Sequence, residues 1–329
     1  MTLTPTEHVL LARVARHYYL EDRSKSDIAD ELGISRFRVA RLLDTARREG
    51  VVSIRIESPT GYDTELSMRL QQMFGLAHAV VVTAEDDEPD TLRALLGRVT
   101  AEVLHGVVTR DDVLGLAWAR SLRGIAHEGA KPLAPCPVVQ LTGALSGPDG
   151  SDVLDLVRRV AKASNGVPHV FYAPLVAPDA ASARSLRRQP EVMRAAALAE
   201  QVTVAVVGVG AWEPELSTIY DMVDPVARRR TGELGAIGEI SGALIDRDGN
   251  ALEAPLTRRI IGVTGDQLRH VDTVISVAYG PAKAPALLAA LRGGLVNGVV
   301  THAGLARALL DVAAEAGLDE AGVRSGRVR

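Results

Sequence analysis

Short runs rich in β-branched residues alternate with longer segments of helical periodicity from about His78 onward. A helix between two strands favours parallel pairing, because a parallel crossover needs a dozen or more residues. Several of the runs are almost continuously apolar, which is typical of strands that helices cover on both faces. The alternation therefore predicts a Rossmann-like α/β domain built on a mainly parallel sheet.

Length and turn residues predict how the chain divides. Its 329 residues suit about two domains, at roughly 100–200 residues per domain. The turn-rich sequence Ser58-Pro59-Thr60-Gly61 marks a break, so we expect a first domain over residues 1–57, a linker over 58–65 and the α/β domain over 66–329. The expected strands of the α/β domain are 79–83, 112–116, 138–141, 169–172, 202–207, 238–245, 273–278 and 295–300. The expected helices are 92–107, 119–126, 152–165, 190–200, 282–292 and 303–317.

The first domain reads as three helices followed by a short strand. The first helix is expected over residues 7–20. Ser24 is placed to cap a second helix, with Asp27 three residues later as its capping-box partner, and Gly33 ends that helix. Ser35 is a suitable cap for a third helix, which runs to Gly50. Residues 51–57 (VVSIRIE) then alternate like a strand or wing.

The segment from residue 24 to 50 meets the spacing demands of a winged-type helix-turn-helix. The contact between its two helices needs a small residue, Ala29, and the turn needs the unhindered Gly33. Ile34 follows as a buried position, and Val39 and Leu42 anchor the second helix. The alternative is an ordinary three-helix bundle with a solvated basic face. We favour the helix-turn-helix because five spaced positions agree.

Positive charge is concentrated in this same segment. The whole chain holds 37 Lys and Arg against 41 Asp and Glu, a net charge of −4, yet residues 33–56 hold six arginines against two acidic residues. A polyanion responds to such a local face within a Debye length of about 10 Å. Arginine reads guanine and binds phosphate, so a DNA duplex is the expected partner. The candidate DNA contacts are Lys25, Ser35, Arg36, Phe37, Arg38, Arg41, Arg47, Arg48 and Arg55.

The chain resembles the SorC/DeoR-type sugar-binding transcriptional regulators. The resemblance begins in the segment above and continues through GLAWARSL (115–122), VVQLTGAL (138–145), VGVGAW (207–212), GAIGEISGALIDRDG (235–249) and AYGPAKAPALLAALRGGLVNGVVT (278–301). It implies an effector domain that resembles sugar-phosphate isomerases in fold. It also implies a DNA operator, a sugar, sugar-phosphate or polyol-phosphate effector, and a homo-oligomer, commonly a tetramer on a repeated operator.

Two glycine-containing segments are candidate parts of the effector site. The segment 115–121 is expected to link a strand to a helix, whose N-terminus suits phosphate. Trp118 in it is expected either to stack on a sugar or to pack in the core. The segment 208–210 is expected to follow a strand. A dinucleotide fingerprint would need a third glycine at Glu213, so a loop facing phosphate or sugar is the better interpretation.

The resemblance adds residues near the end of the chain. It implies that Asp246 hydrogen-bonds effector hydroxyls, although a solvated turn is the alternative, and that Lys283 lies in the pocket rather than on the surface. Pro281 and His302 depart from the family pattern, which usually has glycine and an acidic residue there. The candidate effector contacts are Gly115, Ala117, Trp118, Ala119, Arg120, Ser121, Gly208, Val209, Gly210, Asp246, Gly280 and Lys283.

Other classes of protein fit the sequence less well. Cys136 is the one cysteine, which excludes an intrachain disulfide framework, and we expect no metal and no cofactor. No apolar run approaches the ~20 residues of a membrane span, so a cytoplasmic location is expected. The main alternative is a sugar-phosphate isomerase or deaminase with Asp221, Asp224 or Asp272 as its base, although no motif singles one out. A third interpretation is a protein-binding module.

Overall fold

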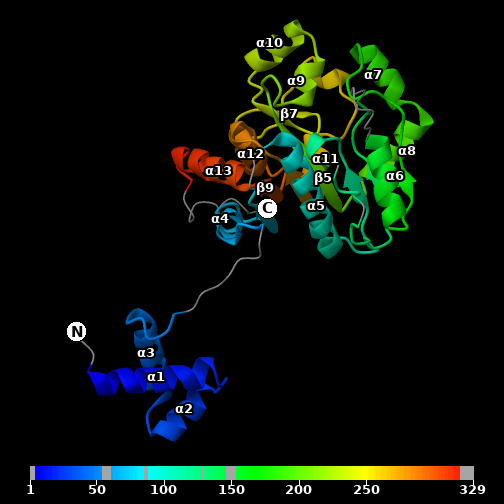
Figure 1. Ribbon diagram of the computed structural model, residues 1–329. Coiled ribbons are helices and arrows are strands. Elements are labelled where there is room, and N and C mark those ends of the chain that lie inside the picture. The colour runs from blue at the N-terminus through cyan, green and yellow to red at the C-terminus, as the bar shows by residue number, and fades with distance from the viewer. Residues whose placement is uncertain are drawn as a thin grey trace. The chain divides into compact units, whose positions relative to one another are not determined.

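The computed structural model describes residues 4–53, 61–84, 88–122, 124–127, 129–145 and 153–318. The chain divides into two compact units, Met1–Ser58 and Pro59–Arg329, each of which is drawn in Figure 1. Of the wing expected over residues 51–57, residues 51–53 are described and form no strand, and residues 54–57, including Arg55, lie outside the described residues.

The first unit consists of α1 (Pro5–Tyr19), α2 (Lys25–Leu32) and α3 (Arg36–Arg48). The predicted helix signals are confirmed. Ser24 and Asp27 form a reciprocal capping box, Gly33 ends α2 in the left-handed region (φ 63°), and the Ser35 hydroxyl accepts a hydrogen bond from the Arg38 amide at 3.2 Å. These residues fix where α2 ends and α3 begins.

A small core of its own holds the first unit together. The apolar stripe of each helix turns inward, and the amide of Ile34 donates to the Ala29 carbonyl at 3.0 Å across the α2–α3 turn. The amide of Val52 donates to the Ala46 carbonyl, which draws the chain after α3 back onto it. The buried residues of this core are Leu11, Val14, Ala15, Ile28, Ala29, Val39, Leu43 and Ala46.

The second unit is built on a sheet of nine strands within the described residues. The strands are β1 (His78–Val82), β2 (Leu114–Leu116), β3 (Val138–Gln140), β4 (Pro168–His169), β5 (Val204–Ala211), β6 (Gly238–Ile240), β7 (Ala243–Ile245), β8 (Thr273–Val277) and β9 (Gly298–His302). Seven of them pair in parallel in the order β1-β9-β8-β5-β2-β3-β4, which confirms the predicted parallel sheet. The antiparallel β6–β7 hairpin attaches to the carboxyl end of β5.

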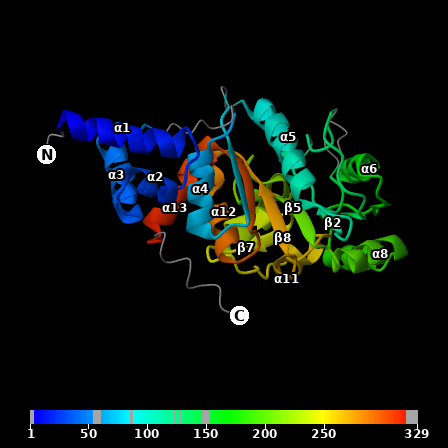
Figure 2. The same cartoon turned by 90° about the horizontal axis from the view of Figure 1, so that it is seen from below.

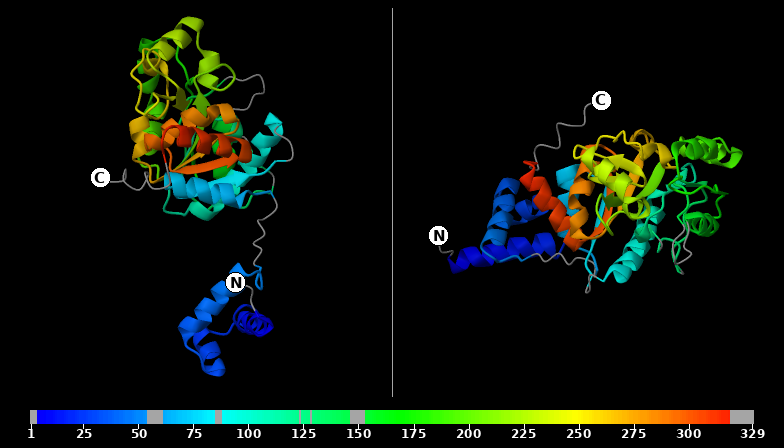
Figure 3. Two further views of the ribbon diagram at one scale, coloured as in Figure 1. Left: turned by 90° about the vertical axis from the view of Figure 1, so that its left-hand side faces the viewer. Right: turned by 90° about the horizontal axis from the view of Figure 1, so that it is seen from above.

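Helices cover both faces of the parallel sheet. The helices of the second unit are α4 (Thr64–Phe74), α5 (Pro89–Val107), α6 (Val153–Ala163), α7 (Ala180–Arg187), α8 (Pro190–Ala199), α9 (Thr218–Met222), α10 (Pro225–Glu233), α11 (Gly265–Arg269), α12 (Ala284–Arg292) and α13 (Ala303–Glu315), and its 3₁₀ turns are η1 (Arg120–Leu122), η2 (Thr257–Arg259) and η3 (Pro281–Lys283). Helices α4, α12 and α13 lie side by side (Figures 1 and 2), and Figure 3 shows α4 in blue beside the orange and red α12 and α13.

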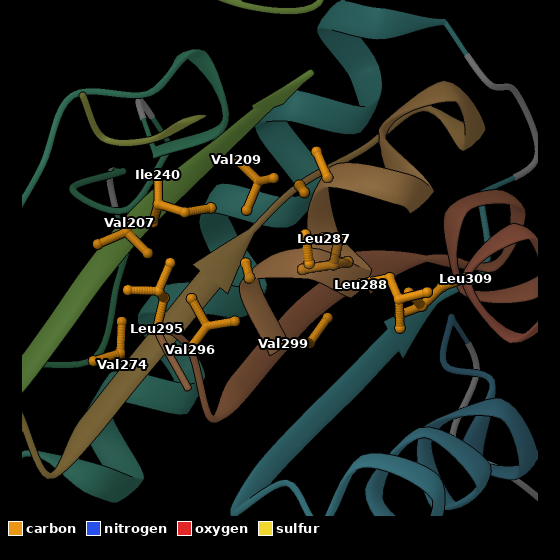
Figure 4. Packing of buried hydrophobic residues seen from close by; sticks show 14 of the residues in the cluster. Val207, Val209, Ile240, Val274, Leu287, Leu288, Leu295, Val296, Val299 and Leu309 are labelled. Atoms are coloured by element: carbon orange, nitrogen blue, oxygen red, sulfur yellow. The ribbon is translucent and has the colours of Figure 1, made fainter. Parts of the chain in front are cut away.

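Two apolar cores lie on the two faces, and the strands serve both. Along β5, Ala205 and Val207 pack with α12 and α13 in one core, while Val204 and Val206 pack with α5 and α6 in the other. Figure 4 shows part of the first core, with aliphatic side chains gathered between the strands and α12. This two-sided burial explains the continuous apolar runs in the sequence.

Neither end strand of the parallel sheet offers a long row of unpaired backbone amides and carbonyls on its outer edge. At one end β4 has two residues, the first of which is Pro168. At the other end the segment around Tyr62 runs antiparallel to β1: the amide of Asp63 donates to the Val81 carbonyl at 2.8 Å, and the amide of Thr83 donates to the Gly61 carbonyl.

Four predicted elements need correction. The strand expected over 169–172 is only the two-residue β4. Residues 238–245 form two strands instead of one, because the backbone reverses at Ser241 and Gly242, both at positive φ. The helix expected over 119–126 is only the 3₁₀ turn η1. Strand β5 runs on to Ala211, so the expected loop at 208–210 is part of a strand whose close neighbours leave no room for a Cβ at Gly208 or Gly210.

Candidate functional site

A cavity of about 110 Å³ opens where the carboxyl ends of β2, β5 and β8 meet. Among the parallel strands, β2 is followed by β3 on one side, and β5 is followed, after the β6–β7 hairpin, by β8 on the other side. Ligands of α/β proteins bind at such a reversal of strand order. The lining residues are Trp118, Ala119, Arg120, Ser121, Thr142, Leu175, Gly208, Val209, Gly210, Glu215, Leu216, Thr218, Ile219, Glu239, Ser241, Gly242, Val277, Tyr279, Gly280 and Lys283.

The two glycines of β5 allow their neighbours to approach closely. A Cβ at Gly208 would lie 2.5 Å from the Cβ of Ala119, and a Cβ at Gly210 would lie 2.4 Å from Oε1 of Glu239. Both distances are far below van der Waals contact. The lack of a side chain at these two positions of β5 therefore allows the segment after β2 and the Glu239 carboxyl group of β6 to reach the same cavity.

Glu239 is a buried carboxylic acid on β6, opposite Gly210 of β5. Its Oε1 accepts a hydrogen bond from the Ser217 hydroxyl at 3.2 Å, and its Oε2 accepts one from the Gly242 amide at 2.8 Å. Burial raises the pKa of the Glu239 carboxyl, and these two hydrogen bonds and the charge of Lys283 only partly oppose that shift. The cavity thus holds an acid that is fixed in position and able to bind hydroxyl groups.

Lys283 brings a cationic group to the same cavity. It ends η3, after Gly280 has turned the chain from β8 at φ 90°, a conformation that favours glycine. Its Nζ lies 5.1 Å from the centre of the Tyr279 ring. Desolvation lowers the pKa of Lys283 to about 8; the charge of Glu239 opposes this shift, and Arg120 and Arg93 add to it. An anionic ligand would relieve this crowding of positive groups.

Two arginines lie near Lys283, one of them in the cavity lining and the other outside it. Arg120 lines the cavity, and its Nη2 lies 3.5 Å from Oδ2 of Asp221. Arg93, on α5, donates from Nε to the Tyr279 hydroxyl at 2.6 Å, and its guanidinium lies 5.4 Å from the Tyr279 ring centre. Tyr279 is therefore held between Arg93 and Lys283, which fixes the wall of the cavity beside the lysine.

The segment after β2 is anchored by polar contacts to its neighbours. The Trp118 amide donates to the Thr142 hydroxyl at 2.9 Å, and the Ser121 hydroxyl donates to the Val277 carbonyl at 2.8 Å. The Trp118 ring packs against two of the apolar clusters. Its indole Nε1 is buried without a hydrogen-bond partner among the described residues. Trp118 is thus both a packing residue and part of the cavity wall.

The structure brings most of the candidate effector residues together at this cavity. Those that line it are Trp118, Ala119, Arg120, Ser121, Gly208, Val209, Gly210, Gly280 and Lys283. Gly115 and Ala117 do not. Gly115 is buried within β2, where a Cβ would lie 2.8 Å from the Leu141 side chain, and Ala117 is buried with its amide bonded to the Val206 carbonyl. These two residues serve packing, which corrects the prediction.

Asp246 also has to be corrected, because it lies outside the cavity lining. Its Oδ1 accepts hydrogen bonds from the amides of Asp248 and Asn250, both at 2.9 Å, and its Oδ2 accepts one from the Asn250 side chain at 3.2 Å. The carboxylate is therefore occupied in holding the turn after β7. Glu239, seven positions earlier in the same sequence block, lines the cavity instead, together with the acidic Glu215.

Several cavity residues were not predicted. Glu239 is the most informative, and its signal was an acidic residue inside an otherwise apolar block. Thr142, Ser241 and Tyr279 also line the cavity, but nothing in their spacing distinguishes them. His302 is buried at the end of β9 and is not among the lining residues.

The candidate catalytic aspartates do not form a centre. Asp224 accepts hydrogen bonds from the amides of Val226 and Ala227 as the cap of α10, and Asp272 and Asp224 are absent from the cavity lining. Asp221 pairs with Arg120 and accepts the Glu215 amide. Over the described part of the chain no cluster of His, Cys, Asp or Glu suits a metal, and no helix is long and apolar enough to cross a membrane.

In the first unit, α3 turns a basic face outward. Its buried side, formed by Val39, Leu43 and Ala46, faces the helix core. The one acidic residue within α3, Asp44, lies 3.4 Å from Arg47. The candidate DNA contacts Lys25, Ser35, Arg36, Phe37, Arg38, Arg41, Arg47 and Arg48 are all exposed in this unit.

Comparison with known proteins gives one consistent result. Residues 58–311 match the family model described as "Putative sugar-binding domain". The chain is 32% identical over 315 residues to the transcriptional regulator LsrR of Klebsiella pneumoniae, covering 94% of this chain and 95% of that protein. It is 28% identical to the deoxyribonucleoside regulator of Bacillus subtilis, covering 92% and 97%.

A solved structure agrees over both units. The full-length sorbitol operon regulator SorC from Klebsiella pneumoniae has a TM-score of 0.70 at 22% identity, covering 94% of this chain and all of that one. These relatives are named as regulators and not as enzymes. The chain therefore belongs to the SorC/DeoR-type family of sugar-binding transcriptional regulators, and it is a sugar-responsive regulator of transcription.

Proposed function

We propose that the cavity at the carboxyl ends of β2, β5 and β8 binds a carbohydrate that carries an anionic group, such as a sugar phosphate or polyol phosphate. Lys283 and Arg120 supply positive charge for the anion, and Glu239 accepts hydrogen bonds from hydroxyls. The observation that carries the proposal is that a partly desolvated lysine and a buried carboxylic acid line one small cavity. A phosphorylated sugar matches both groups, whereas a neutral sugar matches only one.

We propose further that α2, its turn and α3 form a helix-turn-helix, with α3 entering the DNA major groove. The exposed arginines of α3 and the capping of its first turn support this assignment. The relatives' names as transcriptional regulators support DNA as the partner. The functional form in this proposal is a homotetramer on a repeated operator, which sedimentation at micromolar concentration tests directly.

Effector and operator are coupled through linkage in this proposal. An effector that binds two arrangements of the oligomer unequally changes operator affinity by the difference in its binding free energies. A tenfold change needs only about 1.4 kcal/mol, which is less than one charged hydrogen bond contributes at its upper range.

A thermal-shift screen over free and phosphorylated sugars and polyols tests the effector site. We expect a phosphorylated compound to raise the thermal unfolding midpoint of the full-length protein. The same compound should change the protein's affinity for DNA duplexes selected from a random-sequence library. Lys283→Met should abolish the shift, whereas Lys162→Met, on the exposed side of α6, should keep it. An undiminished shift with Lys283→Met removes Lys283 from the site.

Salt titration of DNA binding tests the role of α3. Arg38→Ala and Arg41→Ala should each weaken binding and reduce the slope of log affinity against log salt by about 1 if they contact phosphate. Arg229→Ala on α10 is the matched control, since Arg229 is exposed and pairs with Glu233. If both α3 variants bind the selected duplex like the parent, α3 is not the recognition helix.

A further inference from the structure

Phe37 is an apolar side chain that the fold of its unit does not use. It is 71% exposed at the second position of α3, whereas the other two phenylalanines, Phe74 and Phe171, pack in cores of the second unit. Single exposed apolar residues are common on protein surfaces. Phe37 differs because its neighbours are cationic: the guanidinium of Arg36 lies 5.5 Å from its ring centre.

Helical periodicity places Phe37 in the middle of the outward face of α3. Residues 37, 41, 44 and 48 follow the i, i+4, i+7, i+11 spacing of one helix face, and Val39, Leu43 and Ala46 define the opposite, buried side. Phe37 therefore shares a ridge with Arg41, Asp44 and Arg48, and Asp44 is paired with Arg47 at 3.4 Å. A surface that docks against this ridge must accept a net positive charge and an aromatic ring near its N-terminal end.

The DNA major groove combines these two properties. Its phosphates accept the arginines, and its floor offers one apolar group among the four base pairs, the 5-methyl group of thymine. The first turn of a recognition helix is the part that faces base edges. An A-form RNA duplex does not suit this ridge, because side chains cannot reach the floor of its narrow major groove.

We infer that Phe37 packs on a thymine 5-methyl group in the major groove and so specifies thymine at one position of each half-site. This inference rests on the proposed DNA-binding role of α3 and adds to it a base-specific contact. Guanine contacts by arginine do not require it, so the two parts fail separately. Burial of one methyl group corresponds to about a fourfold change in affinity, which sets the size of the expected effect.

Deoxyuridine scanning tests the inference without changing the protein. Duplexes are first selected from a random library with the full-length parent protein, and each thymine of the selected site is then replaced singly by deoxyuridine, which removes only the methyl group. We expect one thymine per half-site at which the replacement weakens binding about fourfold. Phe37→Ala should bind the thymine and deoxyuridine duplexes equally, and Phe37→Leu should retain part of the preference.

The outcomes separate the inference from the proposal on which it rests. If the parent selects a sequence but no deoxyuridine substitution weakens binding, or if Phe37→Ala keeps the full preference, the thymine contact is overturned while DNA binding stands. If the parent enriches no duplex at low salt, the DNA-binding role of α3 fails first. Because Phe37 is exposed, far-UV circular dichroism of Phe37→Ala should match the parent, which excludes unfolding as the cause of any change.

Discussion

Lys283 and Glu239 illustrate how a binding site differs from the fold that supports it. Both groups lose water on folding, so the pKa of the lysine falls to about 8 and the pKa of the carboxyl rises. Neither shift helps the empty protein, because each one reflects a charged form made less favourable by its surroundings. A ligand that brings an anion to Lys283 and hydroxyls to Glu239 reverses both penalties.

The affinity for an anionic effector should fall as the pH rises from 7 to 9.5. The cationic form of Lys283 binds the anion, and in the empty site that form is lost above about pH 8. Glu239, Arg120, Arg93 and Tyr279 surround the lysine, and the expected fall in affinity follows from the loss of the positive charge of Lys283 itself. Above the pKa of Lys283, the affinity for the effector should fall by at most about tenfold for each pH unit.

Titration calorimetry at pH 7, 8 and 9.5 measures this dependence, with an effector whose own phosphate stays fully ionised over that range. Lys283→Arg keeps the positive charge at all three values, so its affinity should change far less. Equal slopes for Lys283→Arg and the parent would show that another group titrates.

Gly210→Ala should weaken effector binding while the sheet stays folded. The added Cβ would lie 2.4 Å from Oε1 of Glu239 and 2.9 Å from the Cβ of Ser217, so the carboxyl would lose its position and its bond to the Ser217 hydroxyl. Loss of a buried hydrogen bond costs about 1–3 kcal/mol, or roughly 5- to 150-fold in affinity.

Gly232→Ala is the matched control. Gly232 is exposed on α10, and the nearest atoms to an added Cβ lie 3.7 Å away on Trp212, an ordinary contact. Alanine in a helix is favoured over glycine by up to about 1 kcal/mol, so this variant should bind the effector normally. Normal binding by Gly210→Ala would mean that the approach of β5 to β6 does not shape the site.

At the scale of single elements, the N-cap of α3 fixes where the outward face of that helix begins. Ser35→Ala removes the hydroxyl that accepts the Arg38 amide and should destabilise the first unit by about 1 kcal/mol, whereas Ser35→Gly should cost only a few tenths. Urea unfolding followed by far-UV circular dichroism measures the difference. Equal losses for the two variants would mean that the cap hydrogen bond contributes little.

The elements were predictable from sequence where local signals decide them. Caps such as Ser35 and the left-handed Gly33 act within a few residues. The continuous apolar sequence of the strands indicates that both of their faces are buried. The hairpin was not predictable in the same way, because Gly238–Ile245 is mainly apolar and its reversal at Ser241 depends on pairing with β5.

The same limit explains the errors at the site. Asp246 stood in a turn-like composition and Glu239 stood in a strand, and only the register of β5 with β6 places Glu239 opposite Gly210. Lys283 was predicted from the family resemblance and from its place shortly after a strand, three residues beyond Gly280. Residues that reach the cavity through long-range pairing, such as Thr142 and Tyr279, carry no local signal.

At the scale of the whole molecule, the separate core of the first unit predicts that the two units unfold in two transitions. Trp118 and Trp212, the only tryptophans of the chain, both lie in the second unit, so tryptophan emission reports that unit alone, whereas far-UV circular dichroism reports both. A saturating effector at 100 times its dissociation constant adds about 2.7 kcal/mol of stability. It should raise the emission midpoint by roughly 5–10 °C.

Unfolding of the first unit should change the circular dichroism signal without changing tryptophan emission. The midpoint of this transition should stay the same when the effector is added. A single transition with coincident midpoints for both probes would contradict independent unfolding of the two units.

The ends of the parallel sheet have a consequence for how copies of this protein associate. An open strand edge is a template on which another chain can add a strand. Here Pro168 lacks an amide hydrogen on a strand of two residues, and the segment around Tyr62 occupies the outer edge of β1. Strand addition is thereby disfavoured at these two margins of the described parallel sheet, and we expect folded subunits to associate through complementary side-chain surfaces, which can be changed one residue at a time without creating a template for amyloid-like growth.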